Sequence, residues 1–209
     1  MNYYHRMRPY RLINLKGQLK NPTLTRIDIN LPVVNGRISE NHMRLQVYAH
    51  LLEIYSEYTG LVLMSHQGRP GDKDFIPLKQ HWILLRKMLP ADVDIVYIER
   101  DKVFSSEVRE KIQKLKEREI VLLDNMRYFP DETKFNSSTS SYIQFFKGVI
   151  KTCVNDAIPT WHRDNSSLMC LPYIAPTFIG MRSSYELKIL DEVVSKSCLL
   201  YTSPSPRDR

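Results

Sequence analysis

The sequence predicts a three-layer α/β/α, Rossmann-like domain with a mainly parallel sheet. Three short apolar runs bounded by helix- and strand-breaking residues are typical of strands buried on both faces of such a sheet. They are residues 61–64, 120–123 and 153–154. Segments with apolar residues at helical spacing alternate with these runs, which favours right-handed crossovers between parallel strands.

The first half of the chain contains the elements of this pattern in order. Apolar residues at helical spacing predict an amphipathic helix before Gly60. They are Met43, Val47, Leu51, Ile54 and Tyr58. After the strand at 61–64 we expect a glycine- and proline-rich loop to Pro77, a helix around 79–89 and an alternating strand at 93–98.

The second half continues the alternation. A helix with the apolar stripe Val108, Ile112 and Leu115 precedes the strand at 120–123. A serine- and threonine-rich stretch, 136–141, leads to a helix carrying aromatic residues and then to the strand that holds Cys153. The aromatic helix carries Tyr142, Phe145, Phe146 and Val149. A last helix is expected at 185–195.

Length and composition limit the class of protein. The 209 residues, 43% hydrophobic and 25% charged, are enough for one sizeable core. No apolar stretch reaches membrane-spanning length, and residues 1–11 lack the apolar segment of a secretory signal, so we expect a cytoplasmic protein without a membrane partner. The three cysteines have neither the number nor the spacing of a disulfide framework or a zinc site, and we expect no metal site.

The net charge of +7 is compatible with a nucleic-acid surface or with a pocket for a small anion. The richest basic run, 111–118, is interleaved with Glu110, Glu117 and Glu119, which is typical of a solvated helix face. We therefore favour the anion pocket and expect no nucleic-acid partner, while a basic nucleic-acid-binding domain remains the alternative.

Polar clusters lie next to the apolar runs. They occupy residues 26–30, 65–70, 124–127 and 155–157, with His162 and Arg163 following the last cluster. Ligands bind outside the carboxyl ends of strands in open α/β sheets, so these distant clusters are expected to meet in one crevice. Their charges are mostly arginine, whose guanidinium group binds two oxygens at once and suits a phosphate or carboxylate.

These clusters resemble the N-terminal domain of phosphoglycerate kinases. That family reads R-V-D-x-N-x-P, S-H-x-G-R-P, E-N-x-R-F and V-N-D-A-F-G-T-A-H-R-A-H. The counterparts in this chain are residues 26–32, 65–70, 124–128 and 154–165, with order and spacing kept over about residues 26–190. The resemblance implies reversible phosphoryl transfer between ATP and 3-phosphoglycerate, a step of glycolysis and gluconeogenesis.

The resemblance also implies roles for individual residues. The residues expected to contact 3-phosphoglycerate are Asp28, Asn30, Arg44, His66, Arg69, Arg127 and Arg163. Supporting contacts are expected from Arg26, Asn125, Asp156 and His162. Arg44 is also the candidate catalytic residue that stabilises the transferring phosphoryl group. Arg37 competes for that role, because the segment from Ile38 to Arg44 is one residue longer than the segment from the first Ile to the Arg in the family motif I-x-D-D-x-R-I.

Other interpretations remain open for parts of this site. From its position alone, Asp28 would cap the following turn or pair with Arg26. Pro159 and Trp161 replace the glycine and alanine usual in the family, which leaves the orientation of Arg163 open. The substitutions at this site are compatible with a non-catalytic or decayed binding module for phosphorylated acids.

The expected organisation has four parts. Residues 1–23 form an N-terminal extension, 24–184 the substrate-binding domain and 185–197 the start of an interdomain linker helix. Residues 198–209 resemble the translated end of a transposase sequencing adapter and are expected to be a disordered artefact, with a native serine- and proline-rich tail as the alternative. The resemblance implies that a missing C-terminal domain binds ATP or ADP with Mg²⁺, that this fragment carries no cofactor and is inactive alone, and that the protein is a monomer.

Overall fold

The computed structural model describes residues 11–12, 15–40 and 42–196 of the chain. Within these ranges, seven strands form one sheet in the order β1-β9-β8-β2-β5-β7-β6, and every neighbouring pair is parallel. The strands are β1 (Arg11–Leu12), β2 (Thr23–Ile27), β5 (Leu61–Met64), β6 (Asp94–Ile98), β7 (Glu119–Leu123), β8 (Thr152–Asp156) and β9 (Thr177–Ile179). The predicted fold class is confirmed.

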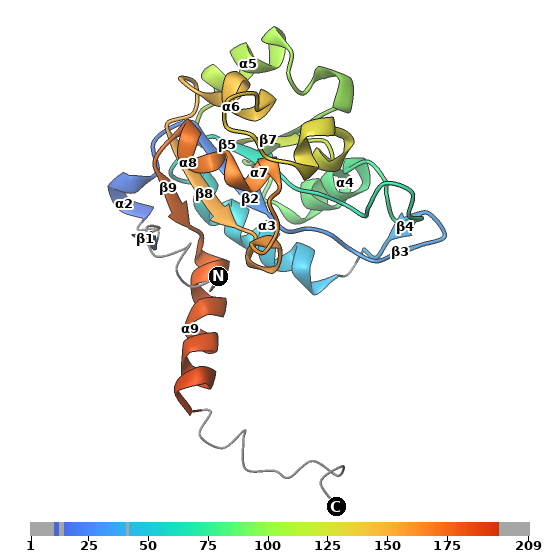
Figure 1. The fold of residues 1–209 in the computed structure, drawn as a ribbon, viewed down its shortest axis with the longest axis vertical. Coiled ribbons are helices and arrows are strands. Elements are labelled where there is room, and N and C mark those ends of the chain that lie inside the picture. The colour runs from blue at the N-terminus through green and yellow to red at the C-terminus, as the bar shows by residue number, and fades with distance from the viewer. Residues whose placement is uncertain (1–10, 13–14, 41, 197–209) are drawn as a thin grey trace, which may run out of the picture.

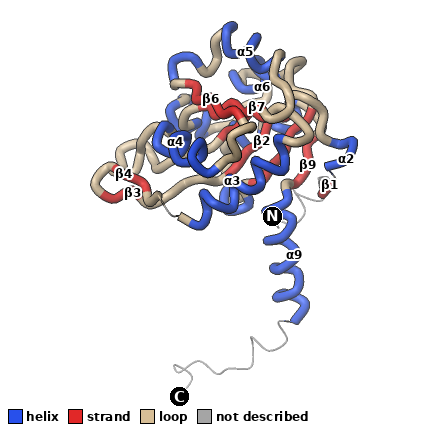
Figure 2. The backbone as a smooth tube through the Cα atoms, turned by 180° about the vertical axis from the view of Figure 1, so that it is seen from behind, coloured by secondary structure: helices blue, strands red, loops and turns tan. Residues whose placement is uncertain are grey.

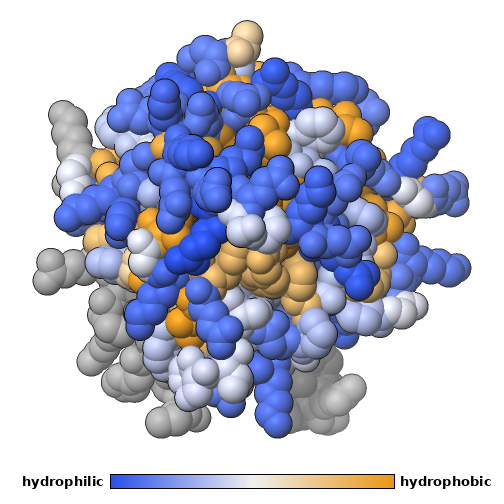
Figure 3. All heavy atoms as spheres, turned by 90° about the horizontal axis from the view of Figure 1, so that it is seen from above, coloured by the Kyte–Doolittle hydropathy of each residue, from blue (hydrophilic) through white to orange (hydrophobic). Residues whose placement is uncertain are grey.

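The structure has helices on both faces of this sheet and one, α9, that extends away from it (Figure 1). They are α2 (Leu15–Gln18), α3 (Met43–Ser56), α4 (Lys79–Met88), α5 (Ser106–Gln113), α6 (Ser141–Phe146), α7 (Ser166–Met169), α8 (Leu171–Ile174) and α9 (Met181–Lys196). One apolar core lies between the sheet and α3 with α4, and a second lies between the sheet and α5, α6 and α8. Figures 1 and 2 view these two sides, and Figure 3 shows a mainly hydrophilic surface at the top of the Figure 1 view.

Short connecting elements complete the fold. Four 3₁₀ helices are described, η1 (Arg100–Lys102), η2 (Met126–Tyr128), η3 (Pro130–Thr133) and η4 (Ile158–Thr160). The strands β3 (Val33–Val34) and β4 (Arg37–Ile38) form a separate antiparallel hairpin. In the part of the chain that the structure describes, no helix is both long and apolar enough to cross a membrane.

Most predicted elements are observed close to their expected positions. β5 has the predicted bounds, and the stripe Val108, Ile112 and Leu115 is buried as expected. β8 continues to Asp156, so part of the last polar cluster lies within the strand and not after it. Arg26 likewise lies inside β2. The prediction contained no counterpart of β9, the last strand in the sequence, or of the short helices α7 and α8.

The predicted buried face of α3 is wrong for most of its residues. Met43 is 75% exposed and Val47 40% exposed. Of the predicted stripe only Leu51 is fully buried, and the other buried residues of the helix lie on a different face: Leu45, Tyr48, Ala49, Leu52, Tyr55 and Ser56. Tyr48 and Tyr55 bury large aromatic surfaces while their hydroxyls find internal hydrogen-bond partners, so burying this face stabilises the fold more than burying Met43 and Val47 would.

Secondary structure continues across both predicted boundaries of the substrate-binding domain. β1 pairs with β9 and β2 begins at Thr23, so some of the described residues before position 24 take part in the sheet. The last helix, α9, begins at Met181 and extends away from the sheet (Figure 1). The assignments of a substrate-binding domain and of a linker helix stay predictions, and the predicted artefact tail lies outside the described residues.

The start of α9 is packed tightly against β8, which gives a testable prediction. A Cβ atom at Gly180 would lie 2.3 Å from Cγ of Asp156. That carboxylate is fixed, because it accepts hydrogen bonds from the Ser183 N–H at 2.8 Å and the Tyr55 hydroxyl at 3.2 Å. We expect Gly180→Ala to lower the free energy of unfolding, measured by urea denaturation, by about 1–3 kcal/mol.

The control is Ser184→Ala in the same turn. It removes one side-chain hydrogen bond to the Gly180 carbonyl and is expected to cost about 1 kcal/mol or less. A Gly180→Ala protein as stable as the wild type would contradict the tight packing.

Candidate functional site

The parallel sheet brings the polar clusters to one edge. β2 lies between β5 and β8, and Arg26 is in register with Met64 on one side and Asn155 on the other. The residues that follow β2, β5 and β7 therefore leave the sheet at neighbouring points. The predicted convergence of these clusters follows from the strand register.

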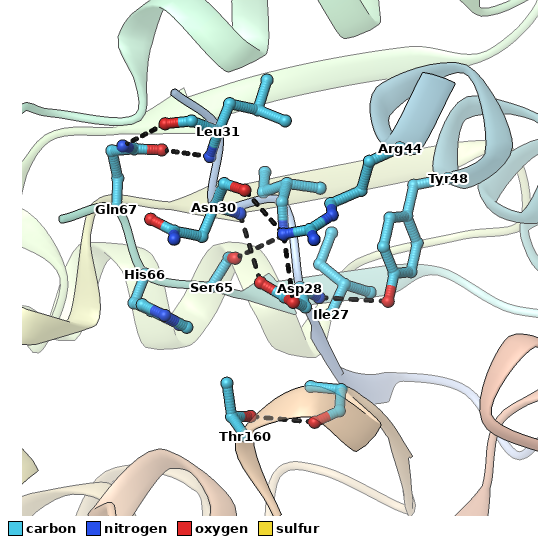
Figure 4. A network of polar contacts seen from close by, with 12 residues as sticks. Ile27, Asp28, Asn30, Leu31, Arg44, Tyr48, Ser65, His66, Gln67 and Thr160 are labelled. Carbon is cyan, nitrogen blue, oxygen red and sulfur yellow. Dashed lines mark hydrogen bonds and ion pairs between the residues drawn. The ribbon is translucent and has the colours of Figure 1, made fainter. Parts of the chain in front are cut away.

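The loop after β2 is held by hydrogen bonds in which Asp28 is central (Figure 4). Its Oδ1 accepts from the Asn30 N–H at 3.2 Å, and its own N–H donates to the Tyr48 hydroxyl at 3.1 Å. That hydroxyl donates in turn to the backbone oxygen of Asp156. Asp28 thus caps the turn, as its position alone suggested, and its carboxylate pairs with Arg44 at 3.3 Å.

Arg44 reaches this loop from the first turn of α3. Its Nη1 donates to the backbone oxygen of Asn30 at 2.6 Å and to Oδ2 of Asp28 at 3.3 Å, and its side chain is 30% exposed. Arg37 lies on the β3–β4 hairpin, where it is exposed. Of the two candidates, Arg44 contacts the loop after β2, whereas Arg37 is exposed on the hairpin.

Gln67 and Asn125 fix the loop after β5. The Gln67 side chain donates to the backbone oxygens of Leu31 at 2.8 Å and Asp74 at 3.1 Å, and accepts from the Leu31 N–H at 2.8 Å. Asn125 donates to the Gln67 backbone oxygen at 2.7 Å and accepts from the Arg127 N–H at 3.2 Å. Gln67 was not among the predicted site residues. The feature of the sequence that could have identified it is its position between His66 and Gly68.

Gly68 allows the backbone of Asp74 to pack directly against it within the loop after β5. Its φ is +64°, and a Cβ atom there would lie 2.4 Å from the backbone of Asp74. Its N–H donates to Oδ1 of Asn30 at 2.9 Å, while its carbonyl accepts from Nη1 of Arg127. A glycine is required here, because the loop is held on both sides and has no room for a side chain.

His66 lies in a field of positive charge. It is 4% exposed, and Figure 4 shows it between the loop that carries Asn30 and the turn that carries Thr160. Burial, followed by repulsion from nearby arginines, lowers its pKa from 6.5 to about 2. The arginines are Arg26, Arg127, Arg163 and Arg44. The imidazole is therefore neutral at physiological pH.

Arg127 experiences the same crowding of cations. It is half-buried, and its pKa is lowered first by burial and then by the charges of Arg163, Arg26 and Arg69, with Glu132 opposing the shift. Guanidinium groups that repel one another gain when an anion with two negative charges comes between them. This edge of the sheet is suited to a phosphate group.

The remaining predicted residues take different positions. Arg69 and His162 are exposed, and His162 accepts a hydrogen bond from Nε of Arg163 at 3.3 Å. The Trp161 indole donates to Oδ1 of Asn155 at 2.7 Å, which ties the unusual tryptophan to β8. The charge of Arg163 contributes to the lowered pKa values of both His66 and Arg127, so Arg163 lies within electrostatic range of these residues.

Two predicted supporting residues are internal. Arg26 is 0% exposed and donates to Nδ1 of His66 at 2.7 Å. Asp156 is 1% exposed and connects β8 to Tyr55 and to the start of α9. Tyr48 was missed as a site residue, because its side chain belongs to the face of α3 that the helical pattern assigned to solvent. Among the described residues, no group of three or more His, Cys, Asp or Glu could hold a metal ion.

Comparisons with known proteins agree with this geometry. Residues 14–199 match the family model of phosphoglycerate kinase. The chain is 32% identical over 180 residues to the phosphoglycerate kinase of Sulfurisphaera tokodaii, covering 83% of this chain and 42% of the relative. It is 33% identical over 176 residues to that of Saccharolobus solfataricus, covering 81% and 42%.

A solved structure gives the same result. The crystal structure of phosphoglycerate kinase from Pyrococcus horikoshii OT3 superposes with a TM-score of 0.76 at 28% identity, covering 94% of this chain and 47% of that one. The chain thus spans less than half the length of these relatives. With the family model matched over most of its residues, the chain belongs to the phosphoglycerate kinase family.

Proposed function

We propose that this site binds 3-phosphoglycerate and that the complete protein is a phosphoglycerate kinase. The reaction transfers a phosphoryl group reversibly between ATP and the carboxylate of 3-phosphoglycerate, giving ADP and 1,3-bisphosphoglycerate. The observation that carries the proposal is the gathering of arginine side chains around the buried, neutral His66, next to the pair formed by Asp28 and Arg44. Family membership supports the same activity.

Each polar group has a role in this proposal. Arg69, Arg127 and Arg163 bind the phosphate, and Asp28 and Asn30 hold the hydroxyl and carboxylate end of the substrate. His66 donates a hydrogen bond to the bound anion. Arg44 contacts the carboxylate and then stabilises the phosphoryl group in transfer, because catalysis of this reaction consists mainly of positioning and charge stabilisation.

The nucleotide is proposed to bind elsewhere. The family uses ATP or ADP with Mg²⁺, and we place these on a second domain to which α9 leads, so that residues 24–184 act as the substrate-binding half and are inactive alone. The exposed apolar residues on α9, with Tyr185 66% and Val193 50% exposed, suit contact with such a domain. The complete enzyme is proposed to be a cytoplasmic monomer.

A binding module without catalysis is the second candidate. The observation that favours it is the hydrogen bond from Trp161 to Asn155 in the cluster 155–157. The alanine that is usual in the family at position 161 could not make this contact, so the cluster differs from that of the family. Addition of the second domain separates the two candidates, since only the kinase would then convert 3-phosphoglycerate.

Calorimetry tests the site itself. Titration with 3-phosphoglycerate is expected to give saturable binding, and titration with a short DNA duplex is expected to give none. If the acid failed to bind while DNA bound with a steep dependence on salt, the positive charge would serve a nucleic-acid surface and the proposal would be wrong.

Arg44 and Arg37 form a matched pair for this test. Arg44→Ala is expected to weaken 3-phosphoglycerate binding by about tenfold to a hundredfold, because a hydrogen bond to a charged group contributes about 1.5–3 kcal/mol. Arg37→Ala makes the same change in net charge on the exposed hairpin and should leave the dissociation constant unchanged. The reverse order of effects in calorimetry would assign the role to Arg37.

A further inference from the structure

A buried polar chain runs behind His66. Glu132, in η3, accepts hydrogen bonds from the N–H and the hydroxyl of Ser167, at 2.9 Å and 2.7 Å. The Ser167 hydroxyl accepts in turn from Nε of Arg26 at 3.1 Å, and Nη2 of Arg26 donates to Nδ1 of His66 at 2.7 Å. Glu132, Ser167 and Arg26 are all 0% exposed.

This chain fixes the tautomer of His66. A guanidinium group has only donors, so the Nδ1 atom that it contacts must carry a lone pair and no proton. The neutral ring then carries its proton on Nε2, at the opposite edge. His66 can therefore offer one N–H donor to an anion, and it can rotate only by giving up the bond to Arg26.

The negative charge of Glu132 offsets part of the cost of burying the positive charge of Arg26. A buried cation without a compensating charge is strongly disfavoured, and burial lowers the pKa of Arg26 while the negative charges of Glu132 and Asp28 oppose that shift. Asp28 is already engaged by Arg44. The serine between Glu132 and Arg26 completes the connection, because it accepts from the arginine and donates to the carboxylate.

We propose that Glu132 and Ser167 are positioning residues that, through Arg26, present His66 to the substrate as a fixed Nε2–H donor. The group recognised is an oxygen of a phosphate or carboxylate. This role deepens the proposed function and rests on it for the identity of the ligand, but the tautomer of His66 can be measured without any ligand. Neither residue belongs to the four polar clusters identified in the sequence, because Glu132 lies on η3 and Ser167 lies on α7.

The test combines nuclear magnetic resonance with calorimetry. Long-range ¹H–¹⁵N correlation spectra of the protein are expected to show wild-type His66 with its proton on Nε2 alone. In Glu132→Gln and Ser167→Ala, the ring should populate both tautomers, and 3-phosphoglycerate should bind about tenfold more weakly. Ser167→Ala removes only a hydroxyl and keeps the test possible if Glu132→Gln does not fold.

Asp131→Asn is the matched control. Asp131 lies in the same 3₁₀ helix, but its carboxylate bonds to Ser141 and has no contact with Arg26 among the described hydrogen bonds. It should lower stability without changing the His66 spectrum or the affinity.

Two results would overturn the positioning role. They are a proton on Nδ1 in the wild type, or folded Glu132→Gln and Ser167→Ala proteins with the wild-type spectrum and affinity. If the His66 spectrum responded as expected while wild-type protein failed to bind 3-phosphoglycerate, the positioning would stand and the proposed function would be wrong.

Discussion

Acidification from pH 6.5 towards pH 4 is expected to destabilise this protein steeply, because two buried histidines stay neutral in the folded state. The pKa of His66 is lowered from 6.5 to about 2, and that of His81 from 6.5 to about 4. Each proton that only the unfolded chain binds costs about 1.4 kcal/mol of stability per pH unit. Two histidines together give about twice that slope over this window.

The structure explains why neither ring accepts a second proton. In His66, Nδ1 is occupied by the hydrogen bond from Arg26, and further arginines surround the ring. In His81, Nε2 faces Oε1 of Gln67 at 3.2 Å, while Nδ1 is buried without a hydrogen-bond partner. A proton on Nδ1 of His66 would face the guanidinium of Arg26, and a second proton on His81 would place a charge in a buried environment.

The sign of the effect follows from the direction of the shifts. Both folded-state pKa values lie below the unfolded value, so the unfolded state binds more protons below pH 6.5. The stability contributed by the neutral rings is complete above pH 6.5 and is lost as the pH falls. Glu132 and Asp156 act in the opposite direction, because burial raises their pKa values.

Urea denaturation over this pH range measures the slope, and a comparison of variants removes the carboxyl contribution. His81→Gln is expected to reduce the slope by about one proton, whereas His50→Gln, at a side chain that is 72% exposed, should leave it unchanged. An unchanged slope in His81→Gln would mean that the buried ring is already protonated in the folded protein.

The sequence was sufficient to predict several strands of the sheet and the edge at which the polar clusters meet. Strands buried on both faces need uninterrupted apolar runs, so β5 and β7 were recognisable without any tertiary information. Because the polar clusters follow these strands in the sequence, they were expected to meet at the carboxyl edge of the sheet. The structure brings Asp28, Arg44 and His66 to that edge, while their contacts with substrate remain proposals.

The rest depends on contacts between residues far apart in the chain. Either face of α3 has helical spacing, and the choice is made by hydrogen bonds from Tyr48 and Tyr55 to Asp156, about a hundred residues away. The connection from Glu132 to Arg26 likewise passes through Ser167, on a helix of four residues with no pattern of its own. Local periodicity carries no information about such contacts.

Arg127→Ala is expected to weaken 3-phosphoglycerate binding by about thirtyfold or more while leaving the free energy of unfolding nearly unchanged. Removing one partner of a desolvated ion pair in a binding site costs about 2–5 kcal/mol of affinity. In the absence of substrate, however, Arg127 is repelled by Arg163, Arg26 and Arg69. Relief of this repulsion offsets the loss of the hydrogen bond to the Gly68 carbonyl.

Calorimetry and urea denaturation on the same samples separate this behaviour from that of a structural arginine. Arg86→Ala is the matched control, because it removes one positive charge at a side chain that is 47% exposed on α4 and should not alter affinity. Arg163→Ala should resemble Arg127→Ala, since each side chain contributes to the repulsion on the other. If Arg127→Ala lost stability and kept its affinity for the acid, the arginine would serve the loop of Gly68 and the phosphate would bind elsewhere.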